Sequence, residues 1–130
     1  KDVPGFVENR VLYALLRECV DLVEKDVIEP EDIDTCVSWG IGYKLAVIGP
    51  MRLLDMAGLD IYHSVASFLN SDLCARTDIS PMINKVAEKG KLGMKSGGGL
   101  FEYSPEELSS LPKERGTKLV AVRKALEGKT

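Results

Sequence analysis

A helical rhythm of apolar residues near the start of the chain most constrains its fold. From Gly5 to about Val27, apolar side chains recur at the i, i+3, i+4 and i+7 spacing of an amphipathic helix. They are Phe6, Val7, Val11, Leu12, Leu15, Leu16, Cys19, Val20, Leu22 and Val23. Such a helix has about 22 residues and would be roughly 33 Å long. A helix this long and this apolar has to pack against several other segments.

Start and stop signals predict further helices along the chain. Pro30 and Pro50 occupy the favoured first position of a helix, Asp60 is a predicted N-cap, and Ser104 and Glu107 have the spacing of a capping box. The predicted helices span residues 30–40, 50–58, 60–69, 81–90 and 104 to about 126, with loops at 40–43 and 93–103. The pattern indicates an all-α fold of about six helices in one domain, residues 1–130.

Composition excludes several classes of protein. The 130 residues carry a net charge of −3, whereas nucleic-acid-binding domains usually show a basic face. No apolar run approaches the roughly 20 residues of a membrane span, so neither nucleic acid nor a membrane is an expected partner. Cys19, Cys36 and Cys74 are odd in number and far apart, which argues against disulfides and zinc and fits a cytoplasmic location.

Glycine clusters and the single histidine do not form a recognisable ligand site. Gly40 and Gly42 begin like a GxGxxG motif, but Leu45 stands where the third glycine belongs, and no strand precedes them. Residues 97–99 lack the spacing of a dinucleotide or P-loop motif. His63 has no second histidine and no ordered set of acids or cysteines near it. We therefore expect no metal and no cofactor bound to this chain alone.

Asn9 is the polar residue that we single out. It lies near the start of the first predicted helix, between the apolar pairs Phe6-Val7 and Val11-Leu12. Asparagine is a mediocre helix former, and its amide offers two donors and one acceptor. From the residues alone, a solvent-facing or locally bonded role is favoured over a functional one.

Four segments, read together, resemble the C-terminal helical domain of the 3-hydroxyacyl-CoA dehydrogenase family. They are KDVPGFVENRVL at residues 1–12, EDIDT at 31–35, GPMRLLDMAGLD at 49–60 and GKLGMKSGGGLFEY at 90–103. The segments occur in family order and reach from residue 1 to residue 103. The last 25 or so residues carry little of the resemblance.

This resemblance implies an enzyme whose parts are divided between two domains. An NAD-binding Rossmann domain, expected upstream of Lys1 and absent from this chain, would supply the catalytic histidine and its glutamate. Asn9 matches an active-site residue that holds the substrate oxygen, and Gly49, Pro50 and Met51 would line the acyl pocket. The resemblance further implies oxidation of 3-hydroxyacyl-CoA to 3-oxoacyl-CoA in fatty acid β-oxidation, a homodimer, and an isolated chain without activity.

Three departures from the family pattern leave alternatives open. Residues 44–48 form a longer loop than usual, Arg52 stands where an acid is usual, and Gly98 and Leu100 replace a lysine and an aromatic residue. The longer loop resembles that of relatives acting on free 3-hydroxy acids, of the gulonate and carnitine dehydrogenase type. Two non-catalytic interpretations also remain. In one the chain is a crystallin-like structural relative, and in the other it is a helical module that only dimerises. The alternative to a dimer is that the apolar stripe of each helix packs into a core within the same chain.

Overall fold

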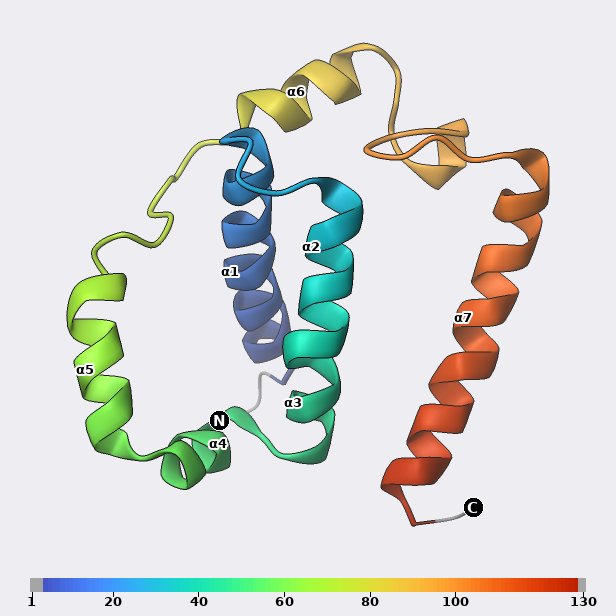
Figure 1. The fold of residues 1–130 in the computed structure, drawn as a ribbon. Helices are drawn as coiled ribbons and strands as arrows, with labels where there is room; N and C mark the ends of the chain where they lie inside the picture. Colours follow the sequence, from blue (N-terminus) through green and yellow to red (C-terminus); the bar gives the residue numbers. More distant parts are fainter. Residues whose placement is uncertain (1–3, 129–130) are drawn as a thin grey trace. The chain divides into compact units, whose positions relative to one another are not determined.

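The computed structural model describes residues 4–128, with the side chains of residues 4 and 5 left out, so that the first three motif residues lie outside it. Within this range there are seven α-helices and no β-strand (Figure 1). Because α3 continues α2 without a break, the seven helices form six separate helical segments. The expected all-α fold of about six helices is confirmed. The chain divides into two compact units, Lys1–Ser80 and Pro81–Thr130.

The first helix, α1 (Pro4–Glu24), ends three residues before the expected end near Val27. Asp26 causes the stop, because its φ of 57° is left-handed. Its N–H donates to the Val23 carbonyl at 3.0 Å, and the Val27 N–H donates to the Leu22 carbonyl at 3.0 Å. These two bonds are those of a Schellman motif, which usually has glycine at the left-handed position.

The second rod is longer than the sequence predicts. The helix α2 (Pro30–Val37) continues into a π-helical segment, η1 (Ser38–Gly42), and then into α3 (Tyr43–Val47). The prediction of a loop at residues 40–43 is therefore wrong. A Cβ on Gly42 would lie 3.2 Å from the Val37 carbonyl oxygen, so the glycine fits a wide turn rather than ending the helix. Trp39, in the π-helical segment, is 72% exposed.

The helices α4 (Pro50–Ala57) and α5 (Leu59–Leu69) contact each other across Gly58, whose φ is 108°. The predicted capping role of Asp60 is wrong. Gly58 is both the C-cap of α4 and the N-cap of α5. Asp60 lies in the first turn of α5, and its side chain makes no capping hydrogen bond. One glycine thus makes the whole turn and leaves no separate position for a capping residue.

The second unit contains α6 (Pro81–Glu88), a short 3-10 turn η2 (Met94–Ser96) and α7 (Pro105–Leu126). The predicted capping box is confirmed at the start of α7. The Glu107 N–H donates to the Ser104 hydroxyl at 3.1 Å, and the Ser104 N–H donates to the Glu107 carboxylate at 3.2 Å. Pro112 lies inside α7 and does not divide it.

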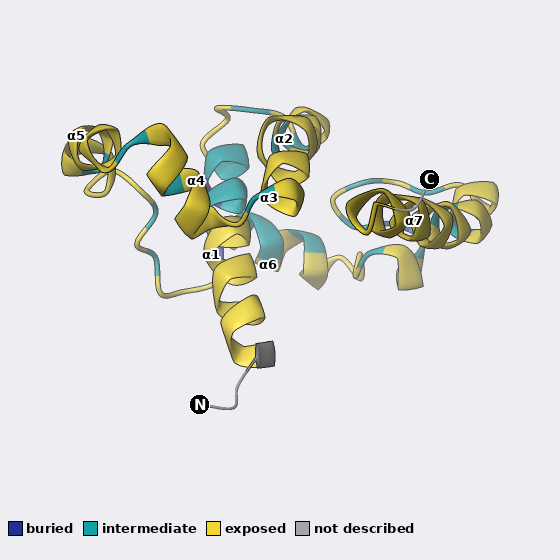
Figure 2. Cartoon of the chain, turned by 90° about the horizontal axis from the view of Figure 1, so that it is seen from below, coloured by how far each residue is buried: buried dark blue, intermediate teal, exposed yellow. Residues whose placement is uncertain are grey.

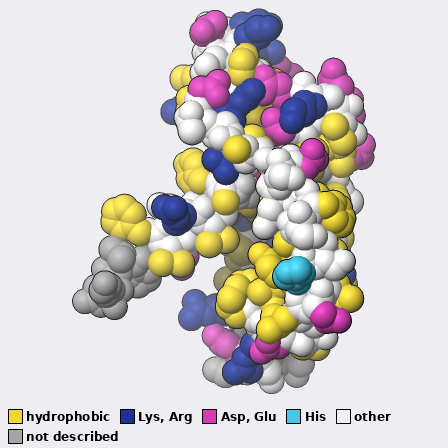
Figure 3. All heavy atoms as spheres, turned by 90° about the vertical axis from the view of Figure 1, so that its left-hand side faces the viewer, with side chains coloured by type: hydrophobic (Ala, Val, Ile, Leu, Met, Phe, Trp, Pro, Cys, Tyr) yellow, Lys and Arg dark blue, Asp and Glu magenta, His cyan; other side chains and the backbone are white. Residues whose placement is uncertain are grey.

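Large apolar side chains are exposed or half-buried throughout residues 6–128. None of the large apolar side chains described there is buried, and Phe6 and Tyr13 are 76% and 67% exposed. Figure 2 shows the first turns of α1 as exposed, and Figure 3 shows hydrophobic side chains spread over the face that carries α5. In the described residues none of these stripes is fully buried, so each leaves apolar surface that further protein could cover.

Candidate functional site

Asn9 lies near the start of α1, where every side chain from residue 6 to residue 17 is exposed. Its side chain makes no hydrogen bond with the part of the chain that the structure describes. The amide is therefore open to a ligand, with its two donors and one acceptor unused. An open amide at this end of α1 fits a residue facing a cleft completed by another domain.

The predicted pocket residues Gly49, Pro50 and Met51 form the entry to α4. Gly49 is the N-cap, with φ −68° and ψ 162°, and Pro50 is the first helical residue. Met51 is 69% exposed, and no heavy atom lies within 4 Å of the point where a Cβ on Gly49 would sit. This entry therefore has room beside it for a ligand or for a second protein surface.

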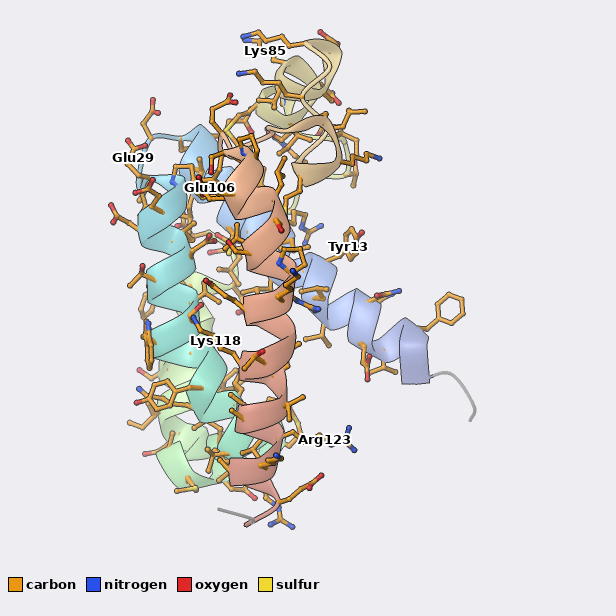
Figure 4. The ribbon with its side chains drawn as sticks, turned by 90° about the vertical axis from the view of Figure 1, so that its right-hand side faces the viewer. Tyr13, Glu29, Lys85, Glu106, Lys118 and Arg123 are labelled. Atoms are coloured by element: carbon orange, nitrogen blue, oxygen red, sulfur yellow. The ribbon has the colours of Figure 1, made fainter. Side chains whose placement is uncertain are left out.

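The described chain does not bring these two predicted parts of the site together. In Figure 2 the first turns of α1 are directed away from α4, and in Figure 4 the same end of α1, marked by Tyr13, extends beyond the neighbouring helices of its unit. The roles of Asn9 and of residues 49–51 stay predictions. A cleft lined by both Asn9 and residues 49–51 would need further protein surface, because these residues alone do not enclose one.

Two cations lie on either side of the α4 entry in the sequence. Lys44 is part of α3, the helix absent from the sequence prediction, and Arg52 is in the first turn of α4, which contains no acidic residue. Both are exposed, and neither forms an ion pair within residues 4–128. The sequence signal for these two cations was the departure from the family pattern at residues 44–48 and at residue 52. Exposed cations of this kind can form charge-assisted hydrogen bonds with an anion.

A cluster of polar side chains, here called the α1 clasp, holds residues 74–80 against α1. The Cys74 N–H donates to the Glu18 carboxylate at 2.8 Å. The Glu24 carboxylate accepts from the Arg76 guanidinium at 2.6 Å and from the Ser80 hydroxyl at 2.7 Å. The acids lie on one side of the last turns of α1, yet sequence analysis did not single them out.

Charge strengthens the clasp. Asp21, only 7% exposed, pairs with Lys25 at 2.7 Å, and the hydrogen bond from Lys25 lowers the pKa of the Asp21 carboxyl. The same bond raises the pKa of Lys25. The hydrogen bond to Glu24 raises the pKa of Arg76. Burial, and then the charge of Asp34, raise the pKa of the Cys19 thiol, which makes this cysteine a poor nucleophile at neutral pH.

The glycine-rich loop at 93–103 is a closed turn rather than a phosphate cradle. The N–H groups of Gly93 and Gly98 donate to each other's carbonyls at 2.9 and 3.1 Å, and the Gly99 N–H donates to the Phe101 carbonyl at 2.9 Å. A Cβ on Gly99 would lie 2.8 Å from the Gly93 Cα, which explains the glycine there. Because these N–H groups are used internally, the residues do not fit the phosphates of NAD.

Residues 4–128 contain neither a cluster of metal ligands nor a helix that could cross a membrane. Histidine, cysteine, aspartate and glutamate side chains nowhere gather in threes as metal ligands within that range. Among the same residues, every helix is too short or too polar to cross a bilayer.

Comparison with known proteins identifies the family. The sequence profile described as 3-hydroxyacyl-CoA dehydrogenase, C-terminal domain, matches residues 5–103. The chain therefore belongs to the 3-hydroxyacyl-CoA dehydrogenase family, of which it carries the C-terminal helical domain. The match ends at Tyr103, one residue before the N-cap of α7.

Individual relatives differ in how much of the chain they match. It is 69% identical over 129 residues to 5-formyl-3-hydroxy-2-methylpyridine 4-carboxylate 5-dehydrogenase of Mesorhizobium japonicum, covering 99% of this chain and 42% of that protein. It is 37% identical over 106 residues to human mitochondrial hydroxyacyl-coenzyme A dehydrogenase, covering 79% of this chain and 32% of that protein. The chain thus spans less than half the length of each of these relatives.

A solved structure is similar over the whole chain. It is the crystal structure of 5-formyl-3-hydroxy-2-methylpyridine 4-carboxylic acid 5-dehydrogenase, described as an NAD⁺-dependent dismutase. The TM-score is 0.95 at 68% sequence identity, and the likeness covers 100% of this chain and 42% of that one. The relatives of this domain are therefore dehydrogenases, including one whose named substrate is not a CoA ester.

Proposed function

We propose that this chain is the substrate-closing domain of an NAD-dependent dehydrogenase that acts on a small free acid of the pyridine-carboxylate kind. The identity of 69% to the Mesorhizobium pyridine-carboxylate dehydrogenase, across 99% of the chain, carries the proposal. Identity to the human CoA dehydrogenase is 37%, over a shorter stretch. The expected acyl-CoA ester becomes the second candidate, supported by family membership, and a role in β-oxidation depends on it.

The charges at the α4 entry suit an anionic substrate. Lys44 and Arg52 are exposed cations without an ion pair in residues 4–128, and they flank the predicted pocket residues. A ring carboxylate forms charge-assisted hydrogen bonds with such groups, and so do the phosphates of CoA. The longer segment that became α3 agrees with the free-acid alternative, although gulonate and carnitine dehydrogenases remain more distant analogies.

Asn9 would position the oxygen of the reacting carbon. In the proposed enzyme, NAD held by the upstream Rossmann domain would accept a hydride from that carbon, and a base on that domain would take the proton of its hydroxyl, which a formyl substrate gains by adding water. A neutral amide donor holds the oxygen beside the base without competing for the proton. The open amide of Asn9, with no partner in the described chain, supports this role.

The open apolar surface supports two partners for the domain. The first turns of α1 expose apolar side chains around the helix, with Phe6, Val7 and Val11 each more than 60% exposed. We infer an upstream domain against one side and a second subunit against another, in a cytoplasmic homodimer. A structural, crystallin-like protein would share this surface and would lack turnover.

A substrate comparison tests the proposal. The full-length protein is incubated with NAD and a formyl- or hydroxymethyl-substituted pyridine carboxylate, and NADH formation is followed; acetoacetyl-CoA with NADH is assayed in parallel. Rapid turnover of the pyridine acid alone supports the proposal. Turnover of the CoA ester alone would move the function to the second candidate. No turnover of either, with NAD bound, would favour a structural protein.

A further inference from the structure

Two exposed aromatic side chains lie against each other on the helical segment that α2, η1 and α3 form. The ring centroids of Trp39 and Tyr43 are 6.2 Å apart, and the ring planes are tilted by 53°. Trp39 is 72% exposed and Tyr43 is 53% exposed. Trp39 is also the single tryptophan of the chain. Rings of this size carry much apolar area, so the pair is a surface on which a further ring would gain stacking and burial.

This aromatic pair is not part of the packing inside its own unit. The helix α2 lies beside α1 (Figure 1). Its half-buried residues, Pro30, Ile33 and Val37, are three and four positions apart and share one face. Trp39 follows Val37 by two positions, which is a rotation of about 200° around the helix. The pair therefore lies on the far side of the helix from its half-buried face, open to a ligand from outside the unit.

The backbone under the pair is a π-helical turn with open space beside it. The Tyr43 N–H donates to the Ser38 carbonyl, five positions back. Single π-helical turns are rare and frequently occur at functional sites. A Cβ on Gly40, the residue after Trp39, would meet no other part of the described chain within 4 Å. The absence of a side chain at Gly40 thus leaves room for a ring to approach beside Trp39.

A cation follows the aromatic pair directly. Lys44, the residue after Tyr43, is exposed and forms no ion pair within residues 4–128. It lies five positions after Trp39, roughly 7 Å along the helix axis. This short spacing suits a small ligand whose anion is attached to the ring itself, as in a pyridine carboxylate, because in NAD and CoA a ribose separates the adenine from the nearest phosphate. An electron-poor pyridine ring also stacks well on the electron-rich face of an indole.

We propose that Trp39 and Tyr43 stack on the ring of the pyridine-carboxylate substrate, with Lys44 binding its carboxylate, and so determine specificity for a ring acid. The inference rests on the proposed function and names the residues of this chain that recognise the ring. Stacking of this kind is the same before and during hydride transfer, so it contributes to KM more than to kcat. The upstream domain would supply the reacting groups.

Binding measured apart from turnover tests the inference on the full-length protein with NAD present. The probe is 3-hydroxypyridine-4-carboxylate, which has no group to oxidise, and cyclohexanecarboxylate offers the same carboxylate without an aromatic face. Titration calorimetry should show Kd for the pyridine acid raised about three- to tenfold by Trp39→Leu and little by Trp39→Phe, which keeps a ring. Kd for cyclohexanecarboxylate should change little in either variant. Tyr62→Leu, at an exposed tyrosine of α5 without a ring contact in the described chain, is the control and should leave both Kd values unchanged.

Fluorescence gives a second readout that does not depend on the leucine variant. The emission of the parent minus that of Trp39→Phe belongs to Trp39, and the pyridine acid should quench it. In a protein that turns over the pyridine acid, no quenching, or an equal Kd for Trp39→Leu and the parent, would reject this inference and leave the proposed function standing. Weaker binding of NAD or CoA to Trp39→Leu, with the pyridine acid unaffected, would assign the pair to adenine and overturn the inference as well. Neither binding nor turnover of the pyridine acid by the parent would contradict the proposed function together with this inference.

Discussion

The Ser80 hydroxyl donates a 2.7 Å hydrogen bond to the Glu24 carboxylate, across 56 positions of sequence. Ser80 is 5% exposed, and Glu24 also binds the Arg76 guanidinium at 2.6 Å. In a domain whose described apolar side chains are open, this polar contact ties the end of α1 to residues 74–80. The clasp is therefore expected to matter more to stability than a surface ion pair would.

Ser80→Ala should lower the free energy of unfolding by about 1–2 kcal/mol, because it removes one bond to a charged acceptor in a nearly buried position. Thermal melting of the full-length protein measures the effect. Ser110→Ala, an exposed serine on α7 without a side-chain bond among the described residues, is the control and should change little. Equal melting temperatures for the two variants would show that the clasp bond adds no stability.

Asp21→Asn should remove a stabilisation that depends on pH. The Lys25 hydrogen bond lowers the pKa of Asp21 in the folded state, so the stabilisation is present above the unfolded value of about 4 and is lost as pH falls through the folded value. Urea titrations from pH 3 to pH 7 should show the variant weaker at neutral pH, with the gap closing below about pH 4. Asp55→Asn, without an ion pair in the described chain, should show no such trend.

Asp26→Gly should stabilise the protein by about 0.5–1 kcal/mol, because φ at this position is 57° and glycine adopts that conformation without strain. Asp26→Val should destabilise, since a β-branched residue is poorly suited to a left-handed position. Asp72→Gly provides the comparison, because Asp72 is outside the set of positive-φ residues. A melting temperature for Asp26→Gly at or below that of the parent would contradict the strain argument.

Asn9→Ala should lower kcat of the full-length enzyme more than tenfold, since removal of a single positioned donor commonly costs that or more. Its melting temperature should stay near that of the parent, because the exposed amide makes no bond within the described chain. Asn84→Ala, an exposed asparagine on α6, should leave kcat unchanged. Steady-state kinetics with the preferred substrate measures the effect. An unaltered kcat for Asn9→Ala would show that Asn9 is not part of the active site.

Arg52→Gln should raise KM for a free pyridine carboxylate about tenfold or more, as expected for the loss of a charge-assisted hydrogen bond to the ring carboxylate. Turnover of acetoacetyl-CoA, where measurable, should respond less. Lys85→Gln, an exposed lysine on α6, serves as the control for lost charge. If KM rises equally for both substrates, Arg52 contributes to the shape of the site rather than to recognition of the acid.

The parts of the fold that sequence predicted correctly depend on interactions within a few residues. The capping box of Ser104 and Glu107 joins positions three apart, and the proline starts of α2 and α4 rest on the fixed φ of that residue. The errors lie where two such signals compete. Gly42 is typical of a helix end, yet it accommodates a π-helical turn, and Gly58 takes the capping role expected of Asp60.

The sequence by itself determined the helical class, most helix starts and the family, because periodicity, capping and short motifs are local properties of the chain. Only the tertiary structure decided which acids of α1 hold residues 74–80, since Glu18 and Glu24 reach partners more than 50 positions away. It also decided that the predicted apolar stripes stay open in residues 6–128. Burial depends on what the rest of the protein places against a helix, and a repeating pattern in one helix carries no record of its partner.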